Sequence, residues 1–179
     1  MEFYVYWVSS NPLLSAAIQF GILGTIGEFI SHRIKTKSFL GFGSILQIVL
    51  KILGWALLGI IIKYGFTGMK GFVNSLLEHN LLPELLKDGV GYAFAVSLVT
   101  NLLFGPQMMA IHRFTDNLIL HRKGFDGIQK AWLTLIWFWI PAHTVTFSLP
   151  KDFQIGLAAL WSVVLGIILG LSMNNNNKK

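Results

Sequence analysis

The stretch Ala131–Pro150, AWLTLIWFWIPAHTVTFSLP, decides the fold class. It carries no charged side chain over twenty residues and contains three of the six tryptophans. A helix of this length on a soluble protein would carry a polar stripe, and this one has almost none. The stretch therefore predicts a membrane-spanning helix.

Pro141 and His143 lie near the middle of that span. Proline has no backbone N–H, so Pro141 leaves the carbonyl one turn earlier without its usual partner and predicts a helix break. His143 and Thr146 follow. Because polar groups inside a bilayer need partners, we expect neighbouring helices to surround this segment.

The composition extends the same interpretation to the whole chain. Of its 179 residues, 54% are hydrophobic and 12% charged, and the mean hydropathy is +0.62. Soluble domains carry about 25% charged residues. We therefore predict an all-α, polytopic transmembrane bundle, with residues 1–173 as one membrane-embedded domain and the NNNNKK segment, residues 174–179, as a disordered tail.

The spacing of the apolar runs predicts about five spans of ~20 residues. They are expected at Pro12–Ser31, Leu40–Ile62, Gly89–Ile111, Ala131–Pro150 and Phe153–Met173. The mixed stretch Lys63–Asp88 predicts an extension of the second span and an interfacial amphipathic helix that ends before Pro83. The start, MEFYVYWVSS, lacks the basic segment of a secretory signal, so we expect the first span to be retained.

Small residues predict close helix packing in two of these spans. They are Gly21, Gly24 and Gly27 in the first span and the GxxxG pair Gly166 and Gly170 in the last. Such glycines are compatible with a homodimer and equally with packing inside one bundle.

The distribution of Lys and Arg predicts the orientation. The first and third loops and the tail carry nine of these residues, against four on the other side. The positive-inside rule then places the N-terminus outside and the C-terminus in the cytoplasm, with the lipid bilayer as the main partner. The net charge of +6 comes without a nucleic-acid-binding motif, so no nucleic-acid partner is expected.

A few polar side chains fall at the depth of the bilayer midplane. At ~1.5 Å per residue, Lys51, Asn101 and His143 lie about 16–18 Å into their spans, near the middle of a ~30 Å core. Glu28 is shallower, but a lysine stem can lean far enough for a pair with Lys51. One hypothesis is a polar path through Glu28, Lys51, Asn101, His143 and Thr146; the other is a structural network that holds the helices together.

Three functions follow from these patterns. The first is a channel or permease for ions or small metabolites, with a small anion favoured because Lys51 and His143 lack an acid at their depth. The second is a non-transporting membrane scaffold that binds partner helices through its glycines. The third is a lipid-modifying enzyme at His112 and Asp116.

Enzyme chemistry has little support in the sequence. His112 and Asp116 stand four residues apart and offer half a metal site, without a third ligand at suitable spacing. GxSxG, HExxH and P-loop patterns are absent from the sequence. Without cysteine there are no disulfides, thiolate metal sites or cysteine nucleophiles. We therefore expect no catalytic residue, metal or cofactor.

The order of several motifs points to a known family. They are Asn11-Pro12-Leu13-Leu14, Gly21, Gly27-Glu28, Gly71-Phe72, Leu77-Glu78, Pro83, Lys87-Asp88-Gly89, Trp139-Ile140-Pro141, His143, Thr146-Phe147, Leu149-Pro150 and Trp161-Ser162. Over about Asn11–Ser172 this order resembles the membrane proteins typified by Mpv-seventeen and the twenty-two-kilodalton peroxisomal membrane protein. The family usually has Gly-Asp at Gly27-Glu28, and its Trp-Tyr after Gly71 is replaced here.

The resemblance implies a channel-like protein of an organelle or inner membrane, with no enzymatic activity. The family usually has four spans, whereas the last apolar run of this chain is long enough to add a fifth. The missing presequence and the asparagine-rich tail favour a bacterial plasma membrane, with the mitochondrial inner membrane and the peroxisome as alternatives.

Overall fold

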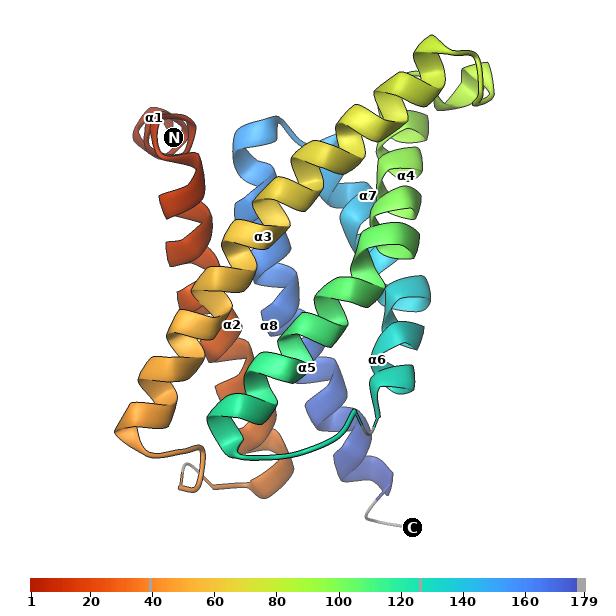
Figure 1. Cartoon of the computed structure of the whole chain (residues 1–179). Coiled ribbons are helices and arrows are strands. Elements are labelled where there is room, and N and C mark those ends of the chain that lie inside the picture. Colours follow the sequence, from red (N-terminus) through yellow and green to blue (C-terminus); the bar gives the residue numbers. More distant parts are fainter. Residues whose placement is uncertain (39, 126, 177–179) are drawn as a thin grey trace.

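The computed structural model describes residues 1–38, 40–125 and 127–176, and this part of the chain is helical without strands. The helices are α1 (Glu2–Ser10), α2 (Pro12–Thr36), α3 (Ile45–Glu78), η1 (Glu84–Leu86), α4 (Gly89–Val99), η2 (Thr100–Phe104), α5 (Gly105–Leu120), α6 (Ile128–Thr134), η3 (Leu135–Trp139), α7 (Ile140–Ser148) and α8 (Lys151–Asn176). The long helices form a bundle in which α2 packs on α3 and α8, α4 on α7, and α3 on α5 (Figure 1).

Four helices are long and apolar enough to cross a membrane: Pro12–Thr36, Ile45–Glu78, Gly89–Leu120 and Lys151–Ile168. These helices are compatible with an integral membrane protein, which agrees with the predicted fold class. The span expected at Ala131–Pro150 forms the helical run α6–η3–α7, which is not among the four. The count of five spans is therefore not confirmed and stays a prediction.

The interfacial helix expected between the second and third spans is not confirmed either. Residues 63–78 continue α3 without interruption, and only the one-turn η1 follows before α4. Packing explains the continuity, because Phe66 and Val73 are buried on this part of α3. The helix ends where Asn80 takes a left-handed backbone and Leu81 N donates to Leu76 O at 2.8 Å, a Schellman motif.

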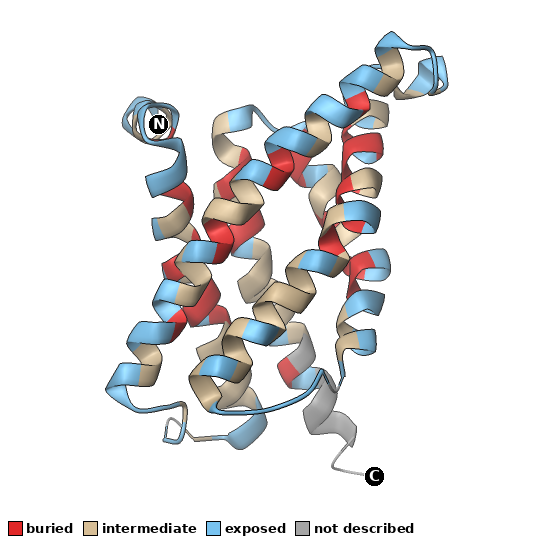
Figure 2. Ribbon diagram, viewed as in Figure 1, coloured by how far each residue is buried: buried red, intermediate tan, exposed pale blue. Residues whose placement is uncertain are grey.

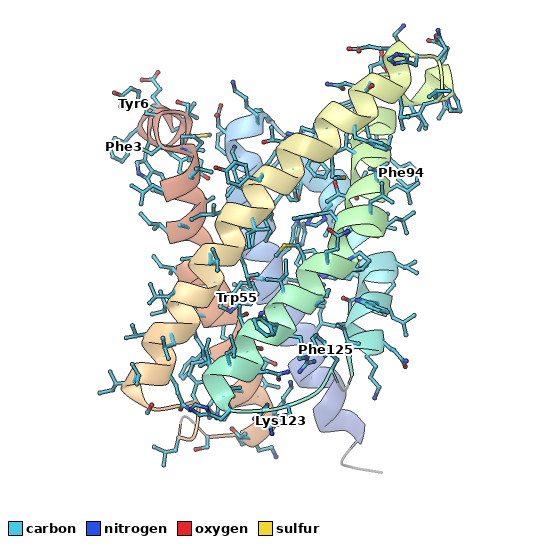
Figure 3. All side chains as sticks on the ribbon, in the orientation of Figure 1. Phe3, Tyr6, Trp55, Phe94, Lys123 and Phe125 are labelled. Atoms are coloured by element: carbon cyan, nitrogen blue, oxygen red, sulfur yellow. The ribbon has the colours of Figure 1, made fainter. Side chains whose placement is uncertain are left out.

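A short helix at the start of the chain lies across the end of α2 (Figure 1). It is held there by Tyr4, whose hydroxyl donates to Gln19 Oε1 at 2.9 Å and whose ring stacks on Phe153 at 5.6 Å. Phe3 and Tyr6 on the same helix are 82% and 71% exposed (Figure 3). Aromatic side chains of this kind suit the membrane–water interface.

The core joins five helices. Its buried members include Phe20 of α2, Phe66 of α3, Val96 of α4, Phe147 of α7 and Ile155 of α8. Buried positions recur along these helices where they face one another (Figure 2). The outward sides carry exposed apolar side chains such as those expected against lipid.

The two prolines inside the bundle share one local geometry. Pro141 follows the π-helical turn η3, and Pro106 follows the π-helical turn η2, each at the start of the next α-helix. A π turn changes the hydrogen-bond register, so each helix continues through a proline that removes one donor. The interruption expected at Pro141 takes the form of this widened turn. The η2 and η3 turns pack against each other.

The glycines predicted for helix packing all lie at contacts within the chain. A Cβ on Gly21 would stand 3.2 Å from Ile52 O of α3, and one on Gly27 would stand 2.9 Å from Ser162 O of α8. One on Gly166 would stand 2.5 Å from Gly27 O. Gly24 packs against the ring of Trp55 on α3, and Gly170 packs against the side chain of Ile34 on α2. These surfaces are therefore occupied inside the bundle.

Helix α8 reaches Asn176 and so includes part of the segment predicted as a disordered tail. Residues 177–179 of that tail lie outside the described residues.

The α2–α8 contact can be tested by adding one methyl group. Gly166→Ala would bring a Cβ onto the Gly27 carbonyl, which is backbone and cannot rotate away, so we expect a loss of about 1–3 kcal/mol in the free energy of unfolding. The matched control is Gly68→Ala on α3, where no atom lies within 4 Å and the change is expected to be neutral or stabilising. Unfolding by sodium dodecyl sulfate in mixed micelles, followed by circular dichroism, measures both. Equal stability of the two variants would contradict the assigned contact.

Candidate functional site: a cavity with a few polar side chains between the helices

A cavity of about 310 Å³ lies inside the bundle. Its walls come from α2, α3, η2, α5, α6, η3, α7 and α8, so segments from nearly the whole chain line it, and part of it is open to the outside. Most of its wall is apolar, with Phe20, Leu58 and Phe104 among the contributors. Against this background a small number of polar side chains stand out, and they form two groups.

The central group joins α4 and η2 to α7. The Asn101 amide nitrogen donates to Ser97 O at 2.8 Å and lies 3.2 Å from His143 Nδ1. Because the contact with the Ser97 carbonyl identifies this atom as the NH₂ group, His143 Nδ1 is the acceptor, and a neutral ring carries its proton on Nε2. Ser97 Oγ donates in turn to Ile140 O at 2.7 Å, directly before Pro141.

Aromatic rings enclose the histidine of this group. The centroid of the His143 ring lies 5.0 Å from that of Trp139, 5.3 Å from Phe66 and 5.9 Å from Phe147. The ring is therefore held in place by one hydrogen bond and three ring contacts.

The second group lies toward the end of the bundle where α2 ends and α3 begins. Glu28 of α2 forms an ion pair with Lys51 of α3, and its other oxygen accepts a 2.7 Å hydrogen bond from Trp55 Nε1. Figure 3 shows Trp55 between α3 and α5, and its ring lies 4.5 Å from that of His112. The Lys51 side chain is 6% exposed and the Glu28 side chain 20%, so the lysine is buried and the carboxylate partly buried.

Glu28 also lies beside His112 and Asp116 and supplies a third possible metal ligand, which the sequence near these two residues does not offer. One ligand atom from each of these three residues lies within 4.8 Å of the others, a geometry that could hold a metal ion. The sequence near His112 and Asp116 offers no third ligand, but the fold brings Glu28 of α2 next to these two residues of α5. Both Glu28 oxygens already accept hydrogen bonds, so a cation would compete with the Lys51 ammonium for this carboxylate.

The cavity collects the polar atoms that lack a partner. Within the described part of the chain, the buried side-chain atoms without a hydrogen bond are Thr100 Oγ1, Asn101 Oδ1, His112 Nδ1 and Trp139 Nε1. All four belong to residues that line this cavity. The nearest carboxylate oxygen to His112 Nδ1, on Asp116, is 4.0 Å away, beyond hydrogen-bonding distance. Buried polar atoms are otherwise paired in nearly every folded protein.

The structure brings together part of the set predicted from sequence. Glu28, Asn101 and His143 line one cavity, and Lys51 is reached through its ion pair with Glu28. Thr146 is fully buried elsewhere, where its hydroxyl accepts from Trp161 Nε1 at 3.1 Å. Neither Thr146 nor Pro141 lines the cavity.

Sequence reasoning missed three members of the site. Trp55 stands one turn after Lys51, so helical spacing could have found it. Thr100 is adjacent to Asn101, and an α-helix would point the two side chains in different directions; both line the cavity from the π turn η2. Trp139 is one turn before His143, so helical spacing could have found it as well. The approach of His112 to Glu28 left no signal in the sequence, because it depends on how α5 packs on α3.

The buried ion pair predicts a particular pattern of stabilities. Lys51→Met would leave the Glu28 carboxylate charged and partly buried, and we expect a loss of about 3–5 kcal/mol in the free energy of unfolding. The double variant Glu28→Gln/Lys51→Met should recover most of this loss, because it buries no charge. As a control, Lys87→Met removes the exposed 3.7 Å pair with Glu84 and should cost under about 1 kcal/mol. Detergent-driven unfolding measures all three, and a double variant no more stable than Lys51→Met would contradict this account.

Comparison with protein-family models, with curated proteins and with solved structures gave no match for this chain.

Proposed function

We propose that this protein is a channel-like permease that passes a small polar solute across its membrane through the cavity between its helices. The observation that carries the proposal is that, among the residues the structure describes, all four buried side-chain polar atoms without a hydrogen bond belong to residues of the cavity wall. Each unpaired polar group costs about 1–3 kcal/mol inside a protein. A solute with its own donors and acceptors would offset that cost while it occupies the cavity.

The size of the cavity supports a small solute. Its volume of about 310 Å³ stands at the lower end of the range for small-molecule sites, ~300–1,000 Å³. At ~30 Å³ per water molecule it has room for on the order of ten waters. A hydrated ion or a small metabolite fits this space.

The two π turns support the same conclusion. Thr100 and Asn101 belong to η2 and Trp139 to η3, so both turns present polar groups to the cavity. Turns of this type occur often at functional sites, because they redirect side chains that an α-helix would place elsewhere.

The scaffold alternative loses its main support. It requires glycine surfaces that are free to bind partner helices, and Gly21, Gly24, Gly166 and Gly170 are all occupied within the chain. The enzyme alternative gains a third acid or base in Glu28, but that carboxylate already holds Lys51 and Trp55. We therefore place both behind transport.

The orientation is part of the proposal. The end of α2, with Lys35 and Lys37, and the α5–α6 link, with Arg122 and Lys123, lie at the same end of the bundle (Figure 1). We place this basic end in the cytoplasm of a bacterial cell and the N-terminus outside, by the positive-inside rule. The resemblance of the sequence motifs to the Mpv-seventeen family also implies a channel-like protein.

A conservative substitution separates transport from a structural role. Thr100→Val keeps the shape of the side chain and removes a hydroxyl that has no partner in the bundle, so stability should stay the same or rise. If that hydroxyl binds the solute, uptake should fall about tenfold, the value of one hydrogen bond of about 1.4 kcal/mol.

The measurement is initial uptake of rubidium, chloride, phosphate, lactate and glycerol into proteoliposomes. Thr115→Val is the control, because its hydroxyl bonds to the carbonyl of His112 in its own helix and the residue does not line the cavity. Asn101→Leu serves as a second test, with Gln107→Leu on the exposed side of α5 as its control. No uptake of any of the five solutes by the natural protein, or full uptake by both Thr100→Val and Asn101→Leu, would overturn the proposal.

A further inference from the structure

A second cavity, of about 350 Å³, lies at the opposite end of the bundle from the Glu28–Lys51 pair. We call it the outer cavity, and the cavity described above the inner cavity. It is lined by α3 and by the first turn of α8, and three lysines, Lys63, Lys70 and Lys151, contribute to its wall. The other polar members are Thr67, Asn74 and Gln154. None of the described residues that line it is acidic.

Helical spacing explains how this basic surface forms. Lys63, Thr67, Lys70 and Asn74 follow one another at three- and four-residue intervals, so they share one side of α3. Lys151 lies at the N-terminus of α8, where the backbone N–H groups add partial positive charge. Three lysine side chains and one helix N-terminus therefore give this cavity a positive electrostatic potential.

One of these lysines is drawn into the wall. The Lys70 ammonium donates to Gln154 Oε1 and lies 5.4 Å from the centroid of the Phe147 ring. Gln154 is 6% exposed and is oriented by a 2.7 Å hydrogen bond from its Nε2 to Leu149 O. A lysine on an ordinary interfacial surface would extend its ammonium into water, whereas this one is fixed by a buried amide.

The two cavities share one lining residue. Phe66 contributes to both walls and is 3% exposed. Its ring contacts Phe147 at 4.7 Å and His143 at 5.3 Å, measured between centroids. Phe66 therefore lies against both the outer and the inner cavity.

We infer that the outer cavity, lined by Lys63, Lys70 and Lys151, binds a small oxyanion, a phosphate or carboxylate group, and that Phe66 is the gate between it and the inner cavity. The inference rests on the proposed function for the gate but not for the binding site. If the outer cavity is the entrance, the transported solute is an anion, because a basic entrance raises the local concentration of anions and repels cations.

Binding is tested without transport. Purified protein in neutral maltoside micelles is titrated with inorganic phosphate, and binding is followed by broadening of the phosphorus-31 resonance. The variant Lys63→Gln/Lys70→Gln/Lys151→Gln should bind phosphate at least about tenfold more weakly. The charge-matched control Lys35→Gln/Lys87→Gln/Lys123→Gln, whose residues lie outside the cavity, should bind as the natural protein does. Absence of binding, or equal binding by the two variants, would overturn the oxyanion site.

A lipid headgroup could supply the same phosphate chemistry, so the titration is repeated in nanodiscs. Phosphate binding that persists in discs containing phosphatidylglycerol assigns the site to a free solute. Displacement of phosphate by phosphatidylglycerol, but not by phosphatidylcholine, assigns it to an anionic lipid and overturns the solute entrance.

The gate is tested by uptake of phosphate into phosphatidylcholine proteoliposomes. Phe66→Ala should raise the initial rate about tenfold, and the milder Phe66→Leu should raise it less, while Phe72→Ala, on an exposed part of α3, should leave it unchanged. An unchanged rate in both Phe66 variants would overturn the gate. If the natural protein takes up no solute at all, the proposed function fails, whereas phosphate binding in micelles still decides the site.

Discussion

Pairing of buried charge is the constraint on which the rest of this structure depends. Glu28 and Lys51 each sit in an apolar helix, where an isolated charge costs several kcal/mol. Their contact fixes how α2 and α3 lie against each other, and the Trp55 indole adds a directional hydrogen bond to the same carboxylate. Once α2 and α3 are in register, Gly24 faces Trp55 and Gly21 faces Ile52. Polar pairing and close packing thus specify the same arrangement.

The sequence predicts the helical membrane architecture and the closely packed glycines, because both depend on local composition and spacing. Phe20 and Phe66 belong to apolar runs, and Gly27 and Gly166 stand among small residues that allow backbones to approach. The pairing of Glu28 with Lys51 follows from the expected depths of the two side chains. These are properties that a single helix, or a neighbouring pair of helices, already carries.

Other features depend on contacts between helices that are distant in sequence. The mixture of glycines, charges and leucines between Lys63 and Asp88 predicted an extension of the second span and an interfacial helix. In the structure α3 continues to Glu78, where Phe66 and Val73 are buried, and the interfacial helix is not confirmed. Thr146 resembled a path residue and instead bonds to Trp161. The meeting of His112 with Glu28, and the shared position of Phe66 in two cavity walls, arise only when α2, α3, α5 and α8 come together.

The backbone contact between Gly27 and Gly166 has a mechanical consequence. Where two helices touch through main-chain atoms, no side chain can rearrange to absorb a shift, so this contact resists sliding of α2 against α8. The other side of the bundle is built differently, since α4–α5 and α6–α7 each change hydrogen-bond register just before a proline. Bending at Pro106 and Pro141 is therefore the low-cost deformation of this molecule. Because Asn101 lies in η2 and His143 follows Pro141, a bend at either proline would change the shape of the cavity that these two residues line.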